Sequence, residues 1–237
     1  HAYHRRQRQM CIRDRSTLCT VCALTFMAVP PKGEGSSDEG GKCPITGLFS
    51  PAKKKAAEAA VPAEVGKVAP PFELMDTNGK AHKLSDFKGK TVVLEWFCAR
   101  CPYSGKASGR SVHSTGKVKK LMEDLKKVDE NIVYLLIDSS SKWSKEDVIK
   151  EAKACAEAMD IKAPMLIDHG GKVGKDYGAR TTPHMYVIDA EGKLRYDGAF
   201  SEQAGRENFV LNAVKAIKKG EDPKPSKTRS WGCGVKY

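Results

Sequence analysis

One stretch decides the fold of this chain, Val92-Val93-Leu94-Glu95-Trp96-Phe97-Cys98-Ala99-Arg100-Cys101-Pro102-Tyr103. An apolar run rich in β-branched residues leads directly into two cysteines separated by two residues, and a long segment with helical periodicity follows. This order predicts a strand that carries thiols to the start of a helix. A Cys-x-x-Cys motif beside a strand–helix–strand pattern is typical of thiol redox proteins, so we expect the chemistry at these cysteines.

Composition divides the 237 residues into five segments. Residues 1–15 are interpreted as translated adapter sequence, because part of them can be encoded by a transposon end used to prepare sequencing libraries. Residues 16–28 form a short apolar run typical of a signal peptide, and residues 29–64 have the composition of a flexible linker. The folded domain is expected at 65–220, followed by an exposed, cysteine-containing tail at 221–237.

The apolar run is too short to cross a bilayer as a stable helix, so we expect no stable membrane span. As an export signal it places the protein in the periplasm or another extracytoplasmic, oxidising compartment. The net charge is +12, of which five arginines and one aspartate among the first fifteen residues contribute +4, leaving +8. The lysines are spread along the chain without interleaved aromatic residues, which favours a solvated surface over a nucleic-acid interface.

Strands alternate with helices along the expected domain, which indicates an α/β fold. Asn78-Gly79 predicts the turn of an early hairpin, and Ser144 with Asp147 three residues later predicts a helix start. Strands are expected at 72–76, 81–84, 91–97, 131–138, 165–168, 184–189 and 194–198, and helices at 144–159, 173–177 and 209–217.

A further helix is expected after the two cysteines. It should begin close to Cys101, break around Ser108-Gly109 and resume from Val118 to Val128. The free amides and partial positive charge of a helix N-terminus stabilise a thiolate, which is the form of cysteine that attacks disulfides and peroxides. The attacking cysteine should therefore stand at the start of this helix.

Several motifs together suggest a family resemblance. They are Ala69-Pro70-Pro71-Phe72, Asn78-Gly79-Lys80, Leu84-Ser85-Asp86-Phe87-Lys88-Gly89-Lys90, the strand-to-cysteine junction, Thr182-Pro183 and the ending Trp231-Gly232-Cys233-Gly234-Val235-Lys236-Tyr237. On these motifs, residues of about 65–220 resemble the thioredoxin-like superfamily, and within it the redoxins, which include AhpC/TSA antioxidant proteins and exported TlpA/ResA-type thiol-disulfide oxidoreductases. The resemblance implies a thioredoxin-like three-layer α/β/α sandwich with an N-terminal β-hairpin extension.

The ending also looks like the Tyr-Gly-Cys-Ser-Val-Lys-Tyr terminus of a bacterial subgroup of redoxins. In that subgroup the central stretch reads Glu-Trp-Phe-Asn-x-x-Cys-Pro, and here Cys98 replaces the asparagine. Thioredoxins carry a buried carboxylate six residues before the attacking cysteine, and Glu95 lies six residues before Cys101. Pro102 suits a first helical turn. The resemblance therefore favours Cys101 as the nucleophile, with Cys98 as the alternative and Ser104 where thioredoxins have their second thiol.

The partner of the attacking thiol is open between two cysteines. Cys98 is close in sequence and is favoured, provided that the loop permits disulfide geometry. Cys233 in the tail is a possible resolving cysteine, as in peroxiredoxins, although it also fits a solvent-exposed thiol. Cys155 lies on an apolar helix stripe and is expected to be a core residue.

Three further residues complete the predicted site. Glu95, if buried, would have a raised pKa and could move a proton during exchange; the alternative is a strand residue facing water. The resemblance places Thr182-Pro183 opposite the attacking cysteine with a cis bond. The backbone of Thr182 would then pair with an extended substrate by strand addition. An ordinary trans proline before a strand is the alternative.

These features favour a thiol-disulfide oxidoreductase that exchanges a cysteine pair with protein disulfides. Its expected partners are protein thiols and disulfides or a reducing redoxin, with no cofactor or metal. A thiol peroxidase is the first alternative, but the family's Pro-x-x-x-Thr/Ser-x-x-Cys pattern is missing and Cys98 stands at the threonine position. A copper-binding protein like the Sco chaperones is a weaker alternative, since their cysteine spacing is one residue longer.

Overall fold

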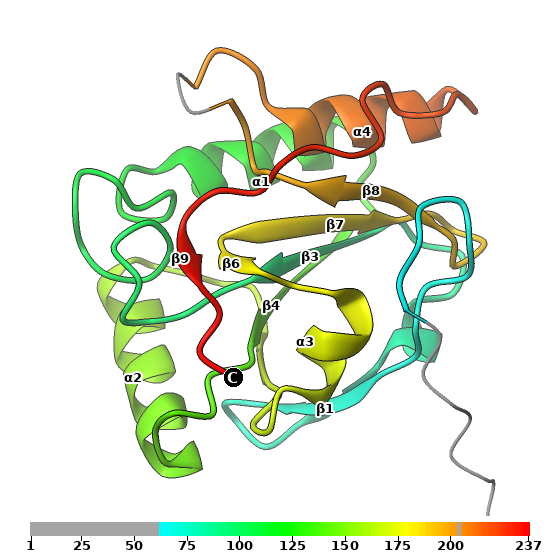
Figure 1. Ribbon diagram of the computed structural model, residues 1–237. Coiled ribbons are helices and arrows are strands. Elements are labelled where there is room, and N and C mark those ends of the chain that lie inside the picture. Colours follow the sequence, from blue (N-terminus) through cyan, green and yellow to red (C-terminus); the bar gives the residue numbers. More distant parts are fainter. Residues whose placement is uncertain (1–61, 203–204) are drawn as a thin grey trace, which may run out of the picture. The chain divides into compact units, whose positions relative to one another are not determined.

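The computed structural model describes residues 62–202 and 205–237, all of which belong to the unit Lys55–Tyr237. The interpreted adapter at 1–15, the apolar run at 16–28 and nearly all of the expected linker at 29–64 lie outside these residues. The fold below is therefore that of the predicted domain and its C-terminal tail (Figure 1).

A seven-stranded mixed sheet forms the middle layer, in the order β2-β1-β5-β4-β3-β7-β8. Strand β3 pairs in parallel with β4 and antiparallel with β7, so the strand that leads to the cysteines lies inside the sheet. The strands are β1 (Glu73–Asp76), β2 (Ala81–Lys83), β3 (Val92–Trp96), β4 (Val133–Asp138), β5 (Met165–Ile167), β7 (His184–Ile188) and β8 (Leu194–Gly198). A separate pair joins β6 (Thr181–Thr182) to β9 (Cys233–Gly234).

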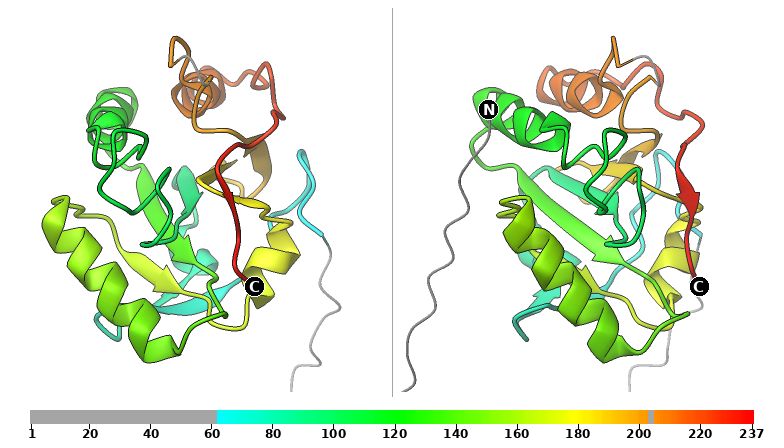
Figure 2. Two further views of the ribbon diagram at one scale, coloured as in Figure 1. Left: turned by 60° about the vertical axis from the view of Figure 1, so that its left-hand side comes forward. Right: turned by 90° about the vertical axis from the view of Figure 1, so that its left-hand side faces the viewer.

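Helices cover both faces of the sheet (Figure 2). They are the 3₁₀ helix η1 (Leu84–Phe87), α1 (Lys117–Val128), α2 (Lys145–Ala158), α3 (Lys172–Tyr177) and α4 (Phe209–Lys218). Successive strand residues point to opposite faces. Val93 and Leu136 pack with α1, α2 and α4, whereas Leu94, Trp96 and Ile137 pack with α3 and η1. The expected three-layer α/β/α sandwich is confirmed.

The N-terminal hairpin is also confirmed. Gly79 has φ 84°, which a turn glycine adopts without strain, and β1 pairs antiparallel with β2. Asp76 stabilises the turn, because its Oδ1 accepts hydrogen bonds from the amides of Asn78 (2.8 Å) and Lys80 (3.0 Å). Strand β1 pairs with β5 on its other side, so the hairpin extends the main sheet.

Helix α2 begins as its sequence predicts. The Ser144 hydroxyl accepts the Asp147 amide at 3.1 Å, which satisfies one of the free donors of the first turn. Val148 and Ala152 are buried on its inner side, and Cys155 belongs to the same core cluster. The prediction of Cys155 as a core residue is confirmed.

The prediction that a helix begins close to Cys101 is wrong, whereas the predicted helical segment from Val118 to Val128 is confirmed by α1. Residues 101–116 form a succession of turns, and α1 begins only after them. Serine side chains bond to the backbone locally and compete with helical hydrogen bonds. The Ser108 hydroxyl donates to the Pro102 carbonyl oxygen at 2.5 Å, and the Ser111 hydroxyl donates to that of Ser104. Cys101 therefore does not stand at the N-terminus of α1.

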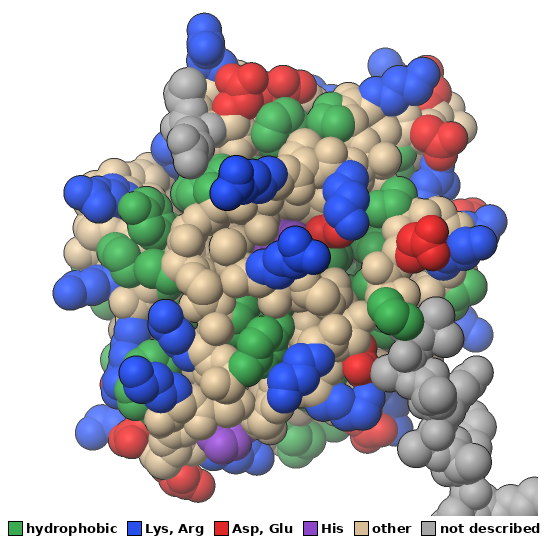
Figure 3. Space-filling view, in the orientation of Figure 1, with side chains coloured by type: hydrophobic (Ala, Val, Ile, Leu, Met, Phe, Trp, Pro, Cys, Tyr) green, Lys and Arg blue, Asp and Glu red, His purple; other side chains and the backbone are tan. Residues whose placement is uncertain are grey.

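Lysine and arginine side chains are scattered over the face drawn in Figure 3, among acidic and apolar ones. Among the described residues, no helix has both the length and the apolar character needed to cross a membrane.

Candidate active site

Cys101 lies beyond the carboxyl end of β3, against the loop that carries β6. Its thiol is 3% exposed and donates to the Thr182 carbonyl oxygen at 3.1 Å. The Tyr103 amide points at the same sulfur, with the nitrogen 3.4 Å away. The Thr182-Pro183 peptide bond is cis, as the resemblance implies. The structure thus brings Cys101, Thr182 and Pro183 together.

Cys98 is buried near the loop after β4. Asp138, Ser140 and Cys101 are all close enough to affect its thiol. Burial, and next the nearby Asp138 carboxylate, raise the pKa of the Cys98 thiol. Asp138 is itself buried, which raises its pKa to about 6, although the Ser140 amide donates to it at 2.9 Å.

Cys233 reaches the site from the other end of the chain. Strand β9 runs beside β6 (Figure 1), and in their antiparallel register Cys233 is opposite Thr182 while Gly234 is opposite Thr181. Burial raises the pKa of the Cys233 thiol to about 11, and the neighbouring Cys101 thiol contributes to this rise. Cys101, Thr182 and Cys233 therefore form one group of contacting residues.

Glu95 is fully buried and does not face water. Its Oε1 lies 2.9 Å from His113 Nε2, and its Oε2 accepts the Tyr134 hydroxyl at 2.5 Å. Burial, followed by the neighbouring carboxylate, raises the pKa of Tyr134 well above its ordinary value. His113 and Tyr134 were not predicted as site residues, because neither belongs to a motif.

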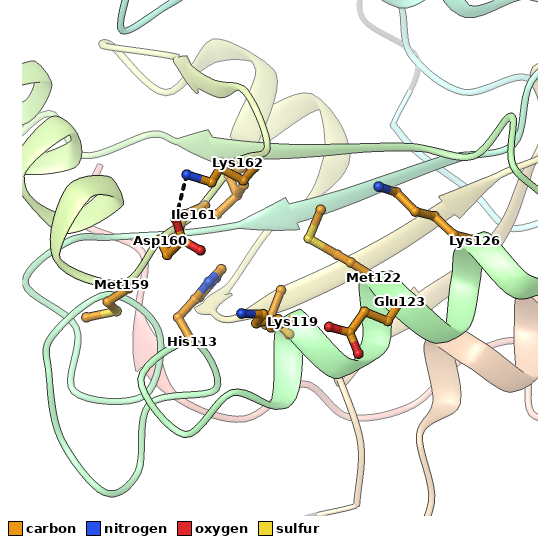
Figure 4. A pocket seen from close by; sticks show the side chains of 11 residues that line it. His113, Lys119, Met122, Glu123, Lys126, Met159, Asp160, Ile161 and Lys162 are labelled. Atoms are coloured by element: carbon orange, nitrogen blue, oxygen red, sulfur yellow. Dashed lines mark ion pairs between the residues drawn. The ribbon is translucent and has the colours of Figure 1, made fainter.

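His113 also lines a cavity of about 190 Å³ beside α1. Figure 4 shows its ring beside the chain that follows α2, near Asp160 and Lys162, with Lys119 on the α1 side. The cavity opens to solvent, so His113 connects the buried Glu95 to water. This arrangement can carry a proton between the interior and the surface.

The remaining candidates near the cysteines have structural partners. The Cys155 thiol donates to the Gly105 carbonyl oxygen at 2.9 Å, and burial raises its pKa to about 11. Arg100 forms an ion pair with Glu151 and stacks on Trp143, 4.2 Å from the ring centroid. Its guanidinium therefore engages α2 and the preceding loop.

Ser104 and Thr182 each have a buried side-chain hydroxyl without a hydrogen-bond partner among the described residues. Unpaired buried hydroxyls are uncommon in folded proteins and often mark functional sites. Within residues 62–202 and 205–237, no group of three or more His, Cys, Asp or Glu side chains is placed to hold a metal ion.

Asp138 near Cys98 was not predicted from the sequence, although a signal for it existed. It ends a buried strand, and the carboxyl ends of neighbouring parallel strands meet at one edge of a sheet. Since β3 and β4 are parallel neighbours, residues that follow β3 and Asp138 had to lie close together.

Comparison with known proteins identifies relatives of this chain. The model of the AhpC/TSA family matches residues 65–197. A thiol-disulfide oxidoreductase ResA of Bacillus thuringiensis is 31% identical over 131 residues, which are 55% of this chain and 67% of the relative. A peroxiredoxin of Thermotoga petrophila is 26% identical over 180 residues, 70% of this chain and 77% of the relative.

Two solved structures share the fold. An uncharacterized conserved protein of Geobacillus kaustophilus is 25% identical with a TM-score of 0.62, covering 73% of this chain and 92% of the other. A hypothetical protein of Sinorhizobium meliloti is 24% identical with a TM-score of 0.61, covering 73% and 94%. The sheet and helices described above therefore recur in these two proteins.

Proposed function

This chain belongs to the AhpC/TSA family of thioredoxin-like redoxins, and from that premise we propose that it is a thiol-disulfide oxidoreductase acting through Cys101. Its clients are proteins with disulfides or thiols, and a reducing redoxin or another dithiol returns it to the starting state. We propose that it acts in an extracytoplasmic compartment, because the apolar run at 16–28 is typical of an export signal.

One observation carries this proposal, the convergence of two cysteines on the Thr182 backbone. Cys101 contacts the Thr182 carbonyl oxygen, and Cys233 is opposite Thr182 in the β6–β9 pair. A thiol and a resolving thiol must approach within bonding distance for exchange to proceed through a mixed disulfide. We therefore assign resolution to Cys233 in place of Cys98, which the sequence analysis favoured.

The reaction then has two steps. The Cys101 thiolate attacks one sulfur of a client disulfide, which forms a mixed disulfide and releases the first client sulfur as a thiolate that takes up a proton. The Cys233 thiolate next attacks the Cys101 sulfur, forming the Cys101–Cys233 disulfide and releasing the second client thiolate. The client gains two electrons, which the two protein thiols lose, and the reverse sequence oxidises a client dithiol.

Glu95 is assigned to proton transfer in this scheme. Its carboxylate is buried, and its neighbour His113, 2.9 Å from Glu95 Oε1, also lines the cavity beside α1. A carboxylate in this position can accept the proton of an attacking thiol and return it to a leaving thiolate.

The test is disulfide mapping of the oxidised protein by peptide mass spectrometry. We expect one intramolecular disulfide between Cys101 and Cys233, and reduction of insulin disulfides by the reduced protein. A Cys98–Cys101 disulfide as the main product would reassign the resolving role to Cys98.

A peroxidase is the second candidate, favoured by the peroxiredoxin of Thermotoga petrophila among the relatives. In that reaction hydrogen peroxide would oxidise Cys101 to a sulfenic acid, and Cys233 would then form the same disulfide with Cys101. Stoichiometric consumption of hydrogen peroxide, much faster than reduction of insulin and abolished by Cys101→Ser, would replace the oxidoreductase with this function.

A further inference from the structure

The C-terminal tail occupies the edge at which an extended client would pair. Strand β9 takes the backbone positions opposite Thr181 and Thr182. Main-chain pairing with an extended peptide uses the same exposed groups of an edge strand. One row of backbone groups binds one strand at a time, so the tail and a client exclude each other from β6.

The residue before Cys233 shows how closely the tail fits this edge. Gly232 has φ 132°, and a Cβ atom built on it would lie 2.2 Å from the Thr182 carbonyl oxygen and 3.3 Å from Pro183 Cδ. Any other residue is therefore both strained and obstructed at this position. Gly234, on the other side of the cysteine, has its nearest neighbour for a Cβ at 3.9 Å, the Arg180 carbonyl oxygen.

An aromatic contact holds the tail before β9. The Trp231 indole packs edge-on against Tyr103, with ring centroids 6.2 Å apart, and its Nε1 donates to the Ser201 carbonyl oxygen at 2.8 Å. Tyr103 is the residue whose amide points at the Cys101 sulfur. The tail thus touches the attacking cysteine's own loop as well as β6.

A second set of contacts holds the tail after β9. The Val235 amide donates to the Arg180 carbonyl oxygen at 3.0 Å, and the Tyr237 hydroxyl donates to that of Ala179 at 2.7 Å. The Tyr237 ring lies over Gly174, where a Cβ atom would approach within 2.6 Å of its hydroxyl oxygen. Tyr237 nevertheless remains 42% exposed. The Lys236 carbonyl oxygen also accepts the Ser141 amide at 2.7 Å, and Val235 packs at the edge of the core. None of residues 230–237 is fully buried, so the strand can leave while the sheet and its helices stay folded.

We propose that residues 230–237 form a displaceable strand that competes with clients for pairing with β6. The return of this strand both releases the client and resolves the mixed disulfide. This inference rests on the proposed function. While a client is bound, its strand holds the Thr182 edge and keeps Cys233 away from the Cys101 sulfur. When the tail returns, Cys233 arrives opposite Thr182 and attacks, forming the Cys101–Cys233 bond and breaking the bond between Cys101 and the client. The departing client sulfur leaves as a thiolate and takes up a proton. Reduction of the Cys101–Cys233 disulfide by an external dithiol frees the tail for the next client.

The experiment compares three full-length proteins that lack the resolving thiol, namely Cys233→Ser alone and combined with either Gly232→Ala or Gly234→Ala. Each reduced protein is mixed with insulin, and the Cys101 mixed disulfide is followed by quenched mass spectrometry. Gly232→Ala should loosen the tail and speed mixed-disulfide formation about tenfold, the effect of an incompatible Cβ of this kind. Gly234→Ala is the matched control and should follow Cys233→Ser, because its Cβ has room.

Hydrogen exchange at the Val235 amide reports tail release directly. It should accelerate in the Gly232→Ala protein and remain slow in the Gly234→Ala protein. With Cys233 present, Gly232→Ala should slow resolution, so the mixed disulfide accumulates. Equal rates of mixed-disulfide formation in all three proteins, with exchange at Val235 accelerated, would overturn the competition. Absence of any mixed disulfide at Cys101 would instead contradict the proposed function itself.

Discussion

Cys98 and Cys101 are three residues apart in the chain and lie in two different surroundings. Cys101 contacts β6 and is covered by a strand from the C-terminus. Cys98 lies against the end of β4, with the Ser140 hydroxyl and the Asp138 carboxylate as neighbours. Cys101 therefore lies against β6 and the tail, whereas Cys98 is the thiol whose pKa the Asp138 carboxylate raises.

Under the proposed pairing of Cys101 with Cys233, sequence spacing alone does not identify the redox pair. A Cys-x-x-Cys motif forms a disulfide readily when both residues share the first turn of a helix, but here that segment consists of turns. Cys233, 132 positions after Cys101, is instead brought in by backbone pairing. Disulfide formation depends on the distance and direction of the side chains, which strand pairing determines.

Exchanging each thiol for a hydroxyl tests this comparison most severely. Cys101→Ser should lower the rate of insulin reduction at least about 100-fold, because a serine hydroxyl cannot replace the attacking thiolate. Cys98→Ser should stay within a few-fold of the unmodified protein, since Ser140 can bond to the new hydroxyl. Single-turnover kinetics of both variants give the result, and similar losses in the two would abolish the distinction.

Glu95 is the buried partner of two polar side chains, which predicts a loss of stability when it is removed. Glu95→Ala would leave the Tyr134 hydroxyl and the His113 ring buried without their acceptor. Each unpaired buried group costs about 1–3 kcal/mol, so the free energy of unfolding should fall by about 2–6 kcal/mol. Urea titration measures it, and Glu95→Gln, which keeps one acceptor oxygen, should lose less.

Much of the fold was predictable because local signals agreed with the final structure. Asn78-Gly79 predicted the hairpin, Ser144 the start of α2, and the apolar stripe the burial of Cys155. The region from 101 to 116 was not predictable in this way, because its serines bond to nearby backbone groups and override the helical pattern.

The residues of the candidate site also divide into those that local sequence predicts and those that only the folded chain brings together. Glu95, Cys101 and Thr182-Pro183 came from the motif and its register, which local sequence contains. The pairing of Thr182 with Cys233 joins two strands of two residues each, and strands of that length leave no periodic pattern. His113 reaches Glu95 from an irregular loop, and only the folded chain reveals that contact.

Asp138 provides a test on the Cys98 side through the pH dependence of stability. Its pKa is 3.8 in the unfolded chain and about 6 in the folded protein, because burial disfavours the charged form. Between these values the folded state binds more protons, so the free energy of unfolding falls as pH rises through this window. Asp138→Asn should remove that fall and be more stable at pH 7 by up to about 3 kcal/mol.

The same variant should also change the reactivity of Cys98. Because the Asp138 charge raises the pKa of Cys98, Asp138→Asn should lower the pH at which iodoacetamide alkylates Cys98. Urea titrations between pH 4 and 7 and alkylation followed by peptide mapping supply both readouts. An unchanged alkylation profile at Cys98 would contradict the contribution of the Asp138 charge.

The smallest expected effect concerns Ser104, which stands where thioredoxins have a second thiol. Its hydroxyl is buried and without a partner among the described residues, and its amide donates to the Cys101 carbonyl oxygen at 3.2 Å. A cysteine tolerates such a position, because a thiol loses less than a hydroxyl when it is buried unpaired. Oxidised Ser104→Cys should therefore contain a minor share of a disulfide between Cys101 and the introduced thiol, beside the major Cys101–Cys233 form. Peptide mapping separates the two disulfides, with Ser104→Ala as the control. If the disulfide to the introduced thiol became the main product, this loop could adopt helical geometry. Proximity in sequence would then outweigh the strand pairing that brings Cys233 to Cys101.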